Sequence, residues 1–505
     1  MQPDATKPPP SHSVERPPAA DYRLLPFRFS RVPGVPDEIL LTTEAGEWLF
    51  LPEGALHPLV HHRLTGCEPF YDDLLARHFI FESATRLPLE PLASQYRTRK
   101  SVLFDGPALH MFVVTLRCDH SCAYCQVSRR AIHRTGFDMS EETARLAIDR
   151  LFESPSPTLT VEFQGGEPLL AFDRVRFIIE AIAERNQREK RDIRYVVATT
   201  LCLLTDEMLA FFRVHNVVLS TSLDGPKWLH DAYRPNRAHD SFDRTIEGLA
   251  RARAALGEDS VAALTTLTRE SLSHPEAIID AYVENAFHSV FLRGLSPYGF
   301  AAQRLPQIGY TAKEMVDFFG RALDYLIRVN IGGYPIDEVA TTLLLTLILT
   351  PLPTPFVDLR SPAGAGLGAL LYNYDGGVYP SDEARMLAEM GNDSLRLGHV
   401  GDTYSELYRS PAMGVLLQSA VAEALPGCAD CAFVPYCGAA PVDALARQGD
   451  PCGYRPTSGF CARQKGLLDL LFVKLHQADL DTIRVFLSWL RHTSFAAIPH
   501  TGHLV

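Results

Sequence analysis

Short apolar runs alternate with longer amphipathic stretches over about residues 105–332. The apolar runs have the length of buried strands. The stretches between them repeat apolar side chains at helical spacing, as in "SEETARLAIDRLF", where Ser140 stands as the N-cap. The six expected strands are "HMFVVTL", "TLTVEF", "IRYVVATT", "VVLSTSL", "VAALTTLT" and "SVFLRGL". Strands that alternate with helices predict an α/β fold with a parallel sheet, either a partial barrel or a doubly wound sheet.

The N-terminal part of the chain has a different pattern. Residues 1–21 hold six prolines and no apolar run, so they are expected to form a disordered leader. Two β-like runs then flank a turn at Gly46, and two helical patterns follow. These elements are Ile39–Thr42, Trp48–Leu51, 55–64 and 70–79. Residues 22–100 are therefore expected to form a small α+β domain.

The alternation also stops beyond residue 335. Residues 335–465 contain a Gly- and Ser-rich stretch and a group of cysteines, and residues 466–505 return to helical periodicity whose apolar stripes are read as packing. The longest apolar run, Val339–Leu349, is too short to cross a bilayer. No membrane association is expected.

Composition narrows the possible partners and the compartment. A chain of 505 residues predicts several domains, and its net charge of −12 argues against broad binding to nucleic acid or to an anionic membrane. The absence of a secretory signal favours the cytoplasm, where thiols stay reduced. The ten cysteines are therefore expected to be ligands or free thiols, not disulfides.

Three cysteines, Cys118, Cys122 and Cys125, follow the first expected strand. They should lie at the carboxyl end of that strand, where α/β folds place active sites. Structural zinc takes four ligands, and His120 within the loop fits no common zinc spacing. Three thiolates on a [4Fe–4S] cluster would leave one iron open. Three buried thiols without a cofactor are the alternative reading.

The CxxxCxxC spacing, with Tyr124 before the last cysteine, resembles the signature of radical S-adenosylmethionine (SAM) enzymes. Further similar motifs follow the second and fourth expected strands, namely "QGGEP" and "STSLDGPKWLHDAYRP". The resemblance implies a partial (β/α)6 barrel, a [4Fe–4S] cluster with an open iron, and SAM as cofactor. The implied SAM-binding residues are Tyr124, Gly165, Gly166, Glu167, Pro168, Ser222 and Arg234.

Within these motifs each residue type suits its implied role. Gly165 and Gly166 let the backbone approach a ligand closely, and Glu167 can accept a hydrogen bond from the SAM ammonium. The third strand departs from the family pattern. It ends in Thr199 and Thr200 where related enzymes often have Asn, which leaves hydrogen bonding to SAM there open.

A second cysteine group comprises Cys428, Cys431 and Cys437, with Cys452 and Cys461 downstream. Four thiolates would make either a zinc or an iron–sulfur site. The region resembles the SPASM or twitch-like extension of radical SAM peptide maturases, which typically carries two auxiliary clusters. That resemblance implies one auxiliary [4Fe–4S] cluster on Cys428, Cys431, Cys437 and Cys461, with Cys452 as the alternate fourth ligand.

The same comparison implies that the other auxiliary cluster has been lost. Three cysteine positions of the family pattern fall at Ser361, Ser381 and Pro441 in this chain. Charged and aromatic residues near these positions either line a peptide channel or belong to a solvated loop. They are Asp358, Arg360, Tyr379, Asp382 and Glu383.

Several other residues carry weaker signals. Cys67 and Cys202 are isolated and are read as small thiols, although Cys202 follows the third strand and can be a hydrogen-atom donor at the barrel mouth. His57, His61 and His62 fit the surface of a helix better than a metal site.

Over most of its length the chain resembles one subgroup, the His-Xaa-Ser system radical SAM maturases. Besides the cysteine motifs, the stretches that carry this resemblance are "LLPFRFSRVPG", "FLRGLSPYGFA" and "LYNYDGGVYPSDEARMLAEMG". It implies reductive cleavage of SAM and hydrogen abstraction by a 5′-deoxyadenosyl radical from a ribosomally made precursor peptide. Residues 22–100 then resemble a leader-peptide recognition domain, which adds a peptide strand to a sheet edge.

The implied partners are the precursor peptide, a flavodoxin- or ferredoxin-like reductant and, as a further candidate, a second maturase of the same system. Two other functions stay open. One is an anaerobic sulfatase-maturase-like enzyme that modifies a protein residue. The other is a non-catalytic, metal-bound scaffold that binds peptides.

Overall fold

The computed structural model describes residues 20–82 and 89–499, so all but the last two residues of the expected leader lie outside the described part. All six strands expected in the alternating region are present, with bounds within two residues of the apolar runs. They are β6 (Leu109–Thr115), β9 (Thr158–Gly165), β10 (Asp192–Ala198), β11 (Val218–Ser222), β12 (Val261–Thr266) and β13 (Ser289–Arg293).

These six strands are parallel and lie in the order β6-β9-β10-β11-β12-β13. Each new strand joins the sheet beside the one before it, always in the same direction. Right-handed crossovers then place the connecting helices on one face. A doubly wound sheet would reverse its strand order, so of the two expected architectures the partial barrel is the correct one.

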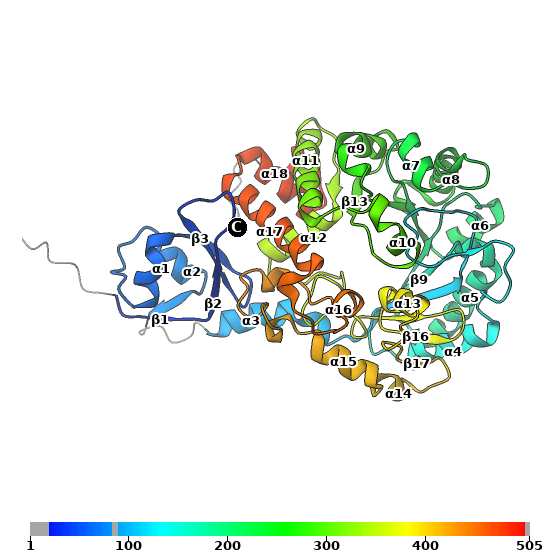
Figure 1. The fold of residues 1–505 in the computed structure, drawn as a ribbon, viewed down its shortest axis with the longest axis horizontal. Coiled ribbons are helices and arrows are strands. Elements are labelled where there is room, and N and C mark those ends of the chain that lie inside the picture. Colours follow the sequence, from blue (N-terminus) through cyan, green and yellow to red (C-terminus); the bar gives the residue numbers. More distant parts are fainter. Residues whose placement is uncertain (1–19, 83–88, 500–505) are drawn as a thin grey trace, which may run out of the picture.

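The helices of this region follow the strands, as Figure 1 shows. They are α4 (Glu141–Phe152), α5 (Phe172–Glu189), α6 (Asp206–Val214), α7 (Lys227–Tyr233), α8 (Ser241–Leu256), α9 (Pro275–Glu284), α10 (Gly299–Ile308) and α11 (Ala312–Ile331). Ser140 caps α4 as expected, because its side chain accepts a hydrogen bond from the Thr143 amide.

The sheet continues beyond the barrel at both ends and has ten strands within residues 20–82 and 89–499. β14 (Asp337–Glu338) pairs with β13, and β15 (Ala369–Tyr372) pairs in parallel with β6. β16 (Gly377–Tyr379) and β17 (Gly398–His399) follow as antiparallel strands. The sequence did not indicate β15, because "ALLY" is buried on both faces and lacks the alternation of a half-exposed strand.

The C-terminal region is mostly helical and shares one hydrophobic core with the barrel. Its helices are α12 (Val339–Leu349), α13 (Asp382–Glu389), α14 (Tyr404–Tyr408), α15 (Pro411–Ser419), α16 (Pro441–Gln448), α17 (Gly459–Gln477) and α18 (Leu480–Leu490). α17 packs against α11 and carries Cys461 in its first turn. The expected boundary at residue 466 therefore falls inside a helix.

The N-terminal domain has its own smaller core. β3 (Glu38–Thr43) and β4 (Trp48–Pro52) form the expected hairpin, and α1 (Glu53–Val60) and α2 (Tyr71–Ala76) are the expected helices. Three strands too short to give a pattern were missed, namely β1 (Tyr22–Leu24), β2 (Phe27–Ser30) and β5 (Ile80–Glu82). β2 joins the hairpin as an edge strand, and β1 pairs with β5.

The helix α3 (Leu89–Arg99) leads from the N-terminal domain into the barrel. In Figure 1 the C-terminal helices α17 and α18 lie between that domain and the barrel helices. Hence the N-terminal domain and the C-terminal helices α17 and α18 lie at one side of the barrel.

Candidate active site

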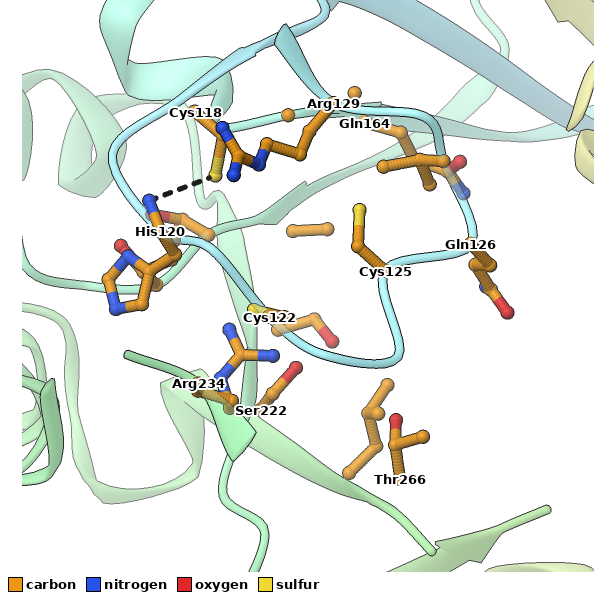
Figure 2. A pocket seen from close by; sticks show the side chains of 18 of the residues that line it. Cys118, His120, Cys122, Cys125, Gln126, Arg129, Gln164, Ser222, Arg234 and Thr266 are labelled. Atoms are coloured by element: carbon orange, nitrogen blue, oxygen red, sulfur yellow. Dashed lines mark hydrogen bonds between the residues drawn. The ribbon is translucent and has the colours of Figure 1, made fainter. Parts of the chain in front are cut away.

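Cys118, Cys122 and Cys125 lie on the loop that leaves the carboxyl end of β6. All three line one cavity of about 230 Å³, and Figure 2 shows the sulfur atoms of Cys118 and Cys125 directed into the space that the loop encloses. A short parallel pair, β7 (Arg117–Cys118) and β8 (Arg130–Ala131), joins the two ends of the loop. The expected position of the three cysteines is therefore correct.

The surroundings of these thiols suit a cationic group. Burial raises the pKa of Cys122 to about 11 and that of Cys118 well above its usual range. Buried thiols ionise when a metal or cluster supplies positive charge. In the described ranges no three His, Cys, Asp or Glu side chains converge on a single ion. An iron–sulfur cluster needs no such convergence, because each thiolate binds a different iron.

His120 is not available as a further ligand. It is buried, and its Nδ1 lies 2.8 Å from Asp119 Oδ1 while its Nε2 lies 2.8 Å from Ser241 Oγ. Its backbone amide donates a hydrogen bond of 3.4 Å to Cys118 Sγ, drawn in Figure 2. His120 therefore holds the loop in place.

Tyr124 and Arg234, two of the expected SAM-binding residues, are linked directly. Arg234 Nη1 donates to the Tyr124 hydroxyl over 2.9 Å, and that hydroxyl donates to the buried carboxylate of Asp224. Both residues line the cavity, as does Ser222, which Figure 2 shows beside Arg234. Two buried polar atoms of the wall, Arg234 Nε and Thr221 Oγ1, have no hydrogen-bond partner among the described residues. Such unpaired atoms can form hydrogen bonds with a polar ligand.

Glu167 has a different position from the one expected. It is fully buried and is not part of the cavity wall. Its carboxylate accepts hydrogen bonds from Leu169 N, Thr199 Oγ1 and Thr200 N at 2.7–3.0 Å. Burial, together with the charge of Asp119, raises the pKa of Glu167 to about 7. Glu167 thus ties the end of β9 to the end of β10, and it is Thr199 and Thr200 that line the cavity.

The two glycines of "QGGEP" line the cavity, but close contacts with the protein backbone are sufficient to explain why glycine is needed at both positions. A Cβ on Gly165 would lie 1.9 Å from the Thr115 carbonyl oxygen, and one on Gly166 would lie 2.1 Å from that of Arg117. Gly165 also has φ of +137°, which few residues with side chains adopt. Both glycines are required for close packing of β9 against the end of β6. Pro168 starts the short helix η2 (Pro168–Ala171) and does not line the cavity.

Other residues of the wall were missed in the sequence. Glu162 and Gln164 lie on β9, and Gln164 Nε2 donates to Glu162 Oε1 over 2.7 Å. A signal for them existed, because they alternate with the buried Val161 and Phe163. Burial raises the pKa of Glu162. Gln126, Arg129, Thr266, Arg293 and Met386 also line the wall, and so does Asp382, for which a peptide channel was one of the two expected places.

The second cysteine group also comes together. Burial and the neighbouring thiols of Cys431 and Cys461 raise the pKa of Cys428 to about 11, and burial raises that of Cys461. Burial and the same neighbours raise the pKa of Cys437 as well. Cys452 packs with Cys428 against one small apolar cluster and its amide donates to Asp450 Oδ1, but it is not among the thiols that raise the pKa of Cys428 or Cys437. This arrangement favours Cys461 over Cys452 as a companion of the other three.

The three positions at which family cysteines are replaced now have structural roles. The Ser361 hydroxyl donates to Glu423 and accepts a hydrogen bond of 2.9 Å from the Ala422 amide. Ser381 is the N-cap of α13, and Pro441 is the first residue of α16. None of these three residues has a thiol that could bind a cluster.

The residues with weaker signals lie apart from the cavity. The Cys202 thiol faces Thr200 O at 3.6 Å and Thr245 Oγ1 at 3.9 Å and does not line the wall, which agrees with the expected small, half-buried thiol and not with the alternative place at the barrel mouth. Cys67 is exposed. His57 and His61 stack on each other at the exposed end of α1, and His62 Nδ1 lies 3.1 Å from Tyr22 O.

Comparisons with known proteins agree with this geometry. Residues 112–281 match the family described as the Radical SAM superfamily. The chain is 31% identical over 183 residues to an uncharacterized protein of Methanothermobacter thermautotrophicus, a match that spans 36% of this chain and 66% of that protein. It is 24% identical over 328 residues to a cysteine-type anaerobic sulfatase-maturating enzyme of Clostridium novyi, a match that spans 64% of this chain and 83% of that enzyme.

Solved structures share the fold at lower identity. A structure described as anSMEcpe with bound AdoMet has a TM-score of 0.62 at 17% identity, over 76% of this chain and 99% of that one. Streptococcus suis SuiB bound to its precursor peptide SuiA has a TM-score of 0.52 at 14% identity, over 86% and 98%. No helix in the described ranges is long and apolar enough to span a membrane.

Proposed function

We propose that this chain, whose residues 112–281 form a radical SAM domain, is a maturase that modifies a ribosomally made peptide. The observation that carries the proposal is the cavity at the carboxyl ends of the barrel strands. Cys118, Cys122 and Cys125 line it together with Thr221 and Arg234, each of which has a buried polar atom without a hydrogen-bond partner among the described residues. A cofactor with both a metal-binding and a polar end suits such a site.

The residues present fit a [4Fe–4S] cluster and SAM. The three thiols would hold the cluster, and Thr221, Ser222 and Arg234 would bind polar groups of SAM. When bound, the two cofactors together supply the electron and the radical that abstracts a hydrogen atom from the peptide. Glu167 keeps Thr199 and Thr200 at the cavity wall, and one of its lone-pair sites can still accept a donor.

The second cysteine group, in residues 335–465, holds one auxiliary [4Fe–4S] cluster on Cys428, Cys431, Cys437 and Cys461. The mutual influence of these thiols supports this set. Four thiolates leave no open iron, so the cluster serves electron transfer or structural support. A flavodoxin- or ferredoxin-like protein is the reductant, and a second maturase of the same system is a candidate partner.

The N-terminal domain, residues 22–100, recognises the leader of the precursor peptide. Support comes from its three-stranded sheet, in which β2 and β4 are edge strands. Phe29 on β2 is 53% exposed, an unusual position for a large apolar side chain. A peptide strand can pair with such an edge and cover the ring.

The substrate that we propose is the precursor peptide of a His-Xaa-Ser system. A second candidate function is the maturation of a sulfatase-type protein residue, which the match to the Clostridium novyi enzyme supports. Both candidates share the cavity and differ in the molecule that enters it. Mass spectrometry after co-expression with either substrate separates them, because only the true substrate changes mass.

Anaerobic reconstitution tests the enzyme itself. We expect about eight irons per chain, from two cubanes, and 5′-deoxyadenosine formation with reductant and SAM. Bound zinc without SAM cleavage would exclude the enzyme and leave a metal-bound scaffold. About twelve irons would show that three clusters are present and that no auxiliary cluster was lost.

A further inference from the structure

A second cavity, of about 190 Å³, adjoins the three-cysteine cavity. Arg293, at the end of β13, lines both cavities. At the start of α13, Asp382 lines the first cavity and its neighbour Glu383 lines the second. The two cavities therefore meet along the end of β13 and the start of α13.

The second cavity occupies the place of the replaced cysteines. Ser381 and Pro441 line it, and so do Asp358 and Leu359, which directly precede the Ser361 segment. No cysteine is among its lining residues in the described chain. Where the SPASM resemblance would put a first auxiliary cluster, this chain has a space with polar walls.

The cavity contains a buried polar group that no protein atom satisfies. Tyr298 is 2% exposed, and its hydroxyl has no hydrogen-bond partner among the described residues. From α16, Asp443 also lines the cavity; it binds Arg447 through Oδ1 at 2.7 Å, whereas its buried Oδ2 has no partner in the described chain. Unpaired buried polar atoms cost free energy unless a ligand or water completes them.

Charges of both signs also face the cavity without a direct hydrogen bond or ion pair among the described residues. The side chains of Arg463 and Asp358 line it. The Arg463 guanidinium lies over the Phe460 ring, and the charges of Arg293, Arg360 and Arg463 favour the ionised form of Asp358. Arg463 comes from α17, and Asp358 comes from the loop before β15. The wall thus offers donors from Tyr298 and Arg463 and acceptors from Asp358 and Asp443.

We infer that the second cavity is a subsite for the backbone of the substrate peptide, next to the residue that is modified in the three-cysteine cavity. The carboxylates would repel a simple anion, and the guanidinium groups would repel a simple cation. A peptide backbone carries N–H donors and C=O acceptors in turn, so it matches both kinds of wall group. This subsite rests on the proposed function, since it assumes that the substrate is a peptide.

The test measures peptide affinity. The probe is a fluorescein-labelled synthetic peptide with His-Xaa-Ser repeats, bound to the reconstituted holoenzyme and followed by fluorescence anisotropy. Tyr298→Phe and Arg463→Gln are each expected to raise its Kd about tenfold, as for the loss of one hydrogen bond to a charged or buried group. Matched controls are Tyr454→Phe, at an exposed tyrosine, and Arg145→Gln, at an exposed arginine of α4. Equal Kd values for cavity and control variants would overturn the subsite.

Photolabelling of the wild-type enzyme avoids any folding defect of a variant. The same peptide with a diazirine-bearing residue, irradiated in the complex, should label segments 291–298 and 440–447. Labelling confined to the N-terminal domain would overturn the subsite and leave the proposed function intact. If the wild-type enzyme cleaves SAM but neither binds nor modifies the peptide, the proposed substrate fails, and with it the subsite.

Discussion

Arg99, at the end of α3, donates a hydrogen bond from Nη1 to the carbonyl oxygen of Pro435, 3.1 Å away in the second cysteine loop. The same buried guanidinium reaches three more carbonyl oxygens, those of Ala45, Leu347 and Thr350, at 2.8–3.1 Å. One side chain thus joins the N-terminal domain, α12 and the loop that we propose to hold the auxiliary cluster.

Replacement of Arg99 should therefore affect both stability and metal content. Arg99→Met keeps an unbranched apolar stem but leaves buried carbonyl groups without donors, and we expect a loss of about 3 kcal/mol in the free energy of unfolding. The measurement is denaturant unfolding, with iron counted after gel filtration. Arg97→Met, at an exposed position of the same helix, is the control. Unchanged stability with Arg99→Met would show that the junction is not cooperative with the rest of the fold.

Single serine substitutions distinguish the fourth ligand of the auxiliary cluster. Cys461→Ser should lower the iron content from about eight to about four per chain, because an incomplete cluster is lost on purification. Cys452→Ser should retain about eight. The reverse pattern would assign Cys452 as the ligand. Iron and sulfide analysis of anaerobically reconstituted protein gives the answer.

Gly165→Ala should prevent correct folding at the end of β9. The new methyl group would collide with the Thr115 carbonyl oxygen, and the positive φ adds strain, together at a cost of about 3 kcal/mol or more. Gly136→Ala is the matched control, since Gly136 also has a positive φ of +81° but has open space around it. Melting temperatures of the two variants isolate the contact from the backbone strain. Equal melting temperatures of the two variants would show that the collision with the Thr115 carbonyl oxygen does not destabilise the fold.

The stability of the chain should carry a pH signature from Glu338, whose side chain accepts hydrogen bonds from Thr341 N and Leu292 N. Burial raises its pKa to about 7, above the value near 4.3 of an unfolded chain. The fold therefore favours the protonated form, and this contribution is full below about pH 4 and is lost as the pH rises to about 7.

Glu338→Gln removes this titration. Relative to the wild type, the variant should gain about 3 kcal/mol of stability between pH 5 and pH 8. Melting curves at both pH values test this, with Glu284→Gln, at an exposed helix position, as the control. If the stability difference between Glu338→Gln and the wild type is the same at both pH values, Glu338 is ionised in the folded chain throughout this range.

The proposed leader-peptide site predicts a specific effect at the edge strand β2. Phe29→Asp should weaken binding of the full precursor about tenfold, because it places a charge where an apolar peptide side chain would pack. Leu480→Asp, at an exposed leucine that begins α18, should leave the affinity unchanged. Calorimetry or anisotropy with the full precursor is suitable. An unaffected Phe29→Asp variant would place leader recognition elsewhere.

Local patterns in the sequence account for most of the barrel and for the position of its cysteines. Each barrel strand has a short stretch rich in apolar residues, and the carboxyl ends of parallel strands meet at one edge. From these two facts alone, Cys118 and Ser222 are expected at one site, and both line the same cavity.

Features that depend on distant parts of the chain were beyond such patterns. The direction of the Glu167 carboxylate depends on hydrogen bonds from Thr199 and Thr200, more than thirty residues away. The contact of Arg99 with Pro435 joins positions 336 residues apart. A side chain's motif predicts its type of chemistry, whereas its partners are decided by tertiary packing.

The parallel pairing of β15 with β6 has a practical consequence for anyone who wishes to divide this protein. β6 lies in the middle of the ten-stranded sheet only because residues 369–372 cover its outer side. A fragment that ends near residue 335 would leave β6, a largely apolar strand, with free backbone groups, which is a template for aggregation. The barrel is therefore expected to be obtained in soluble form only together with the segment that follows it.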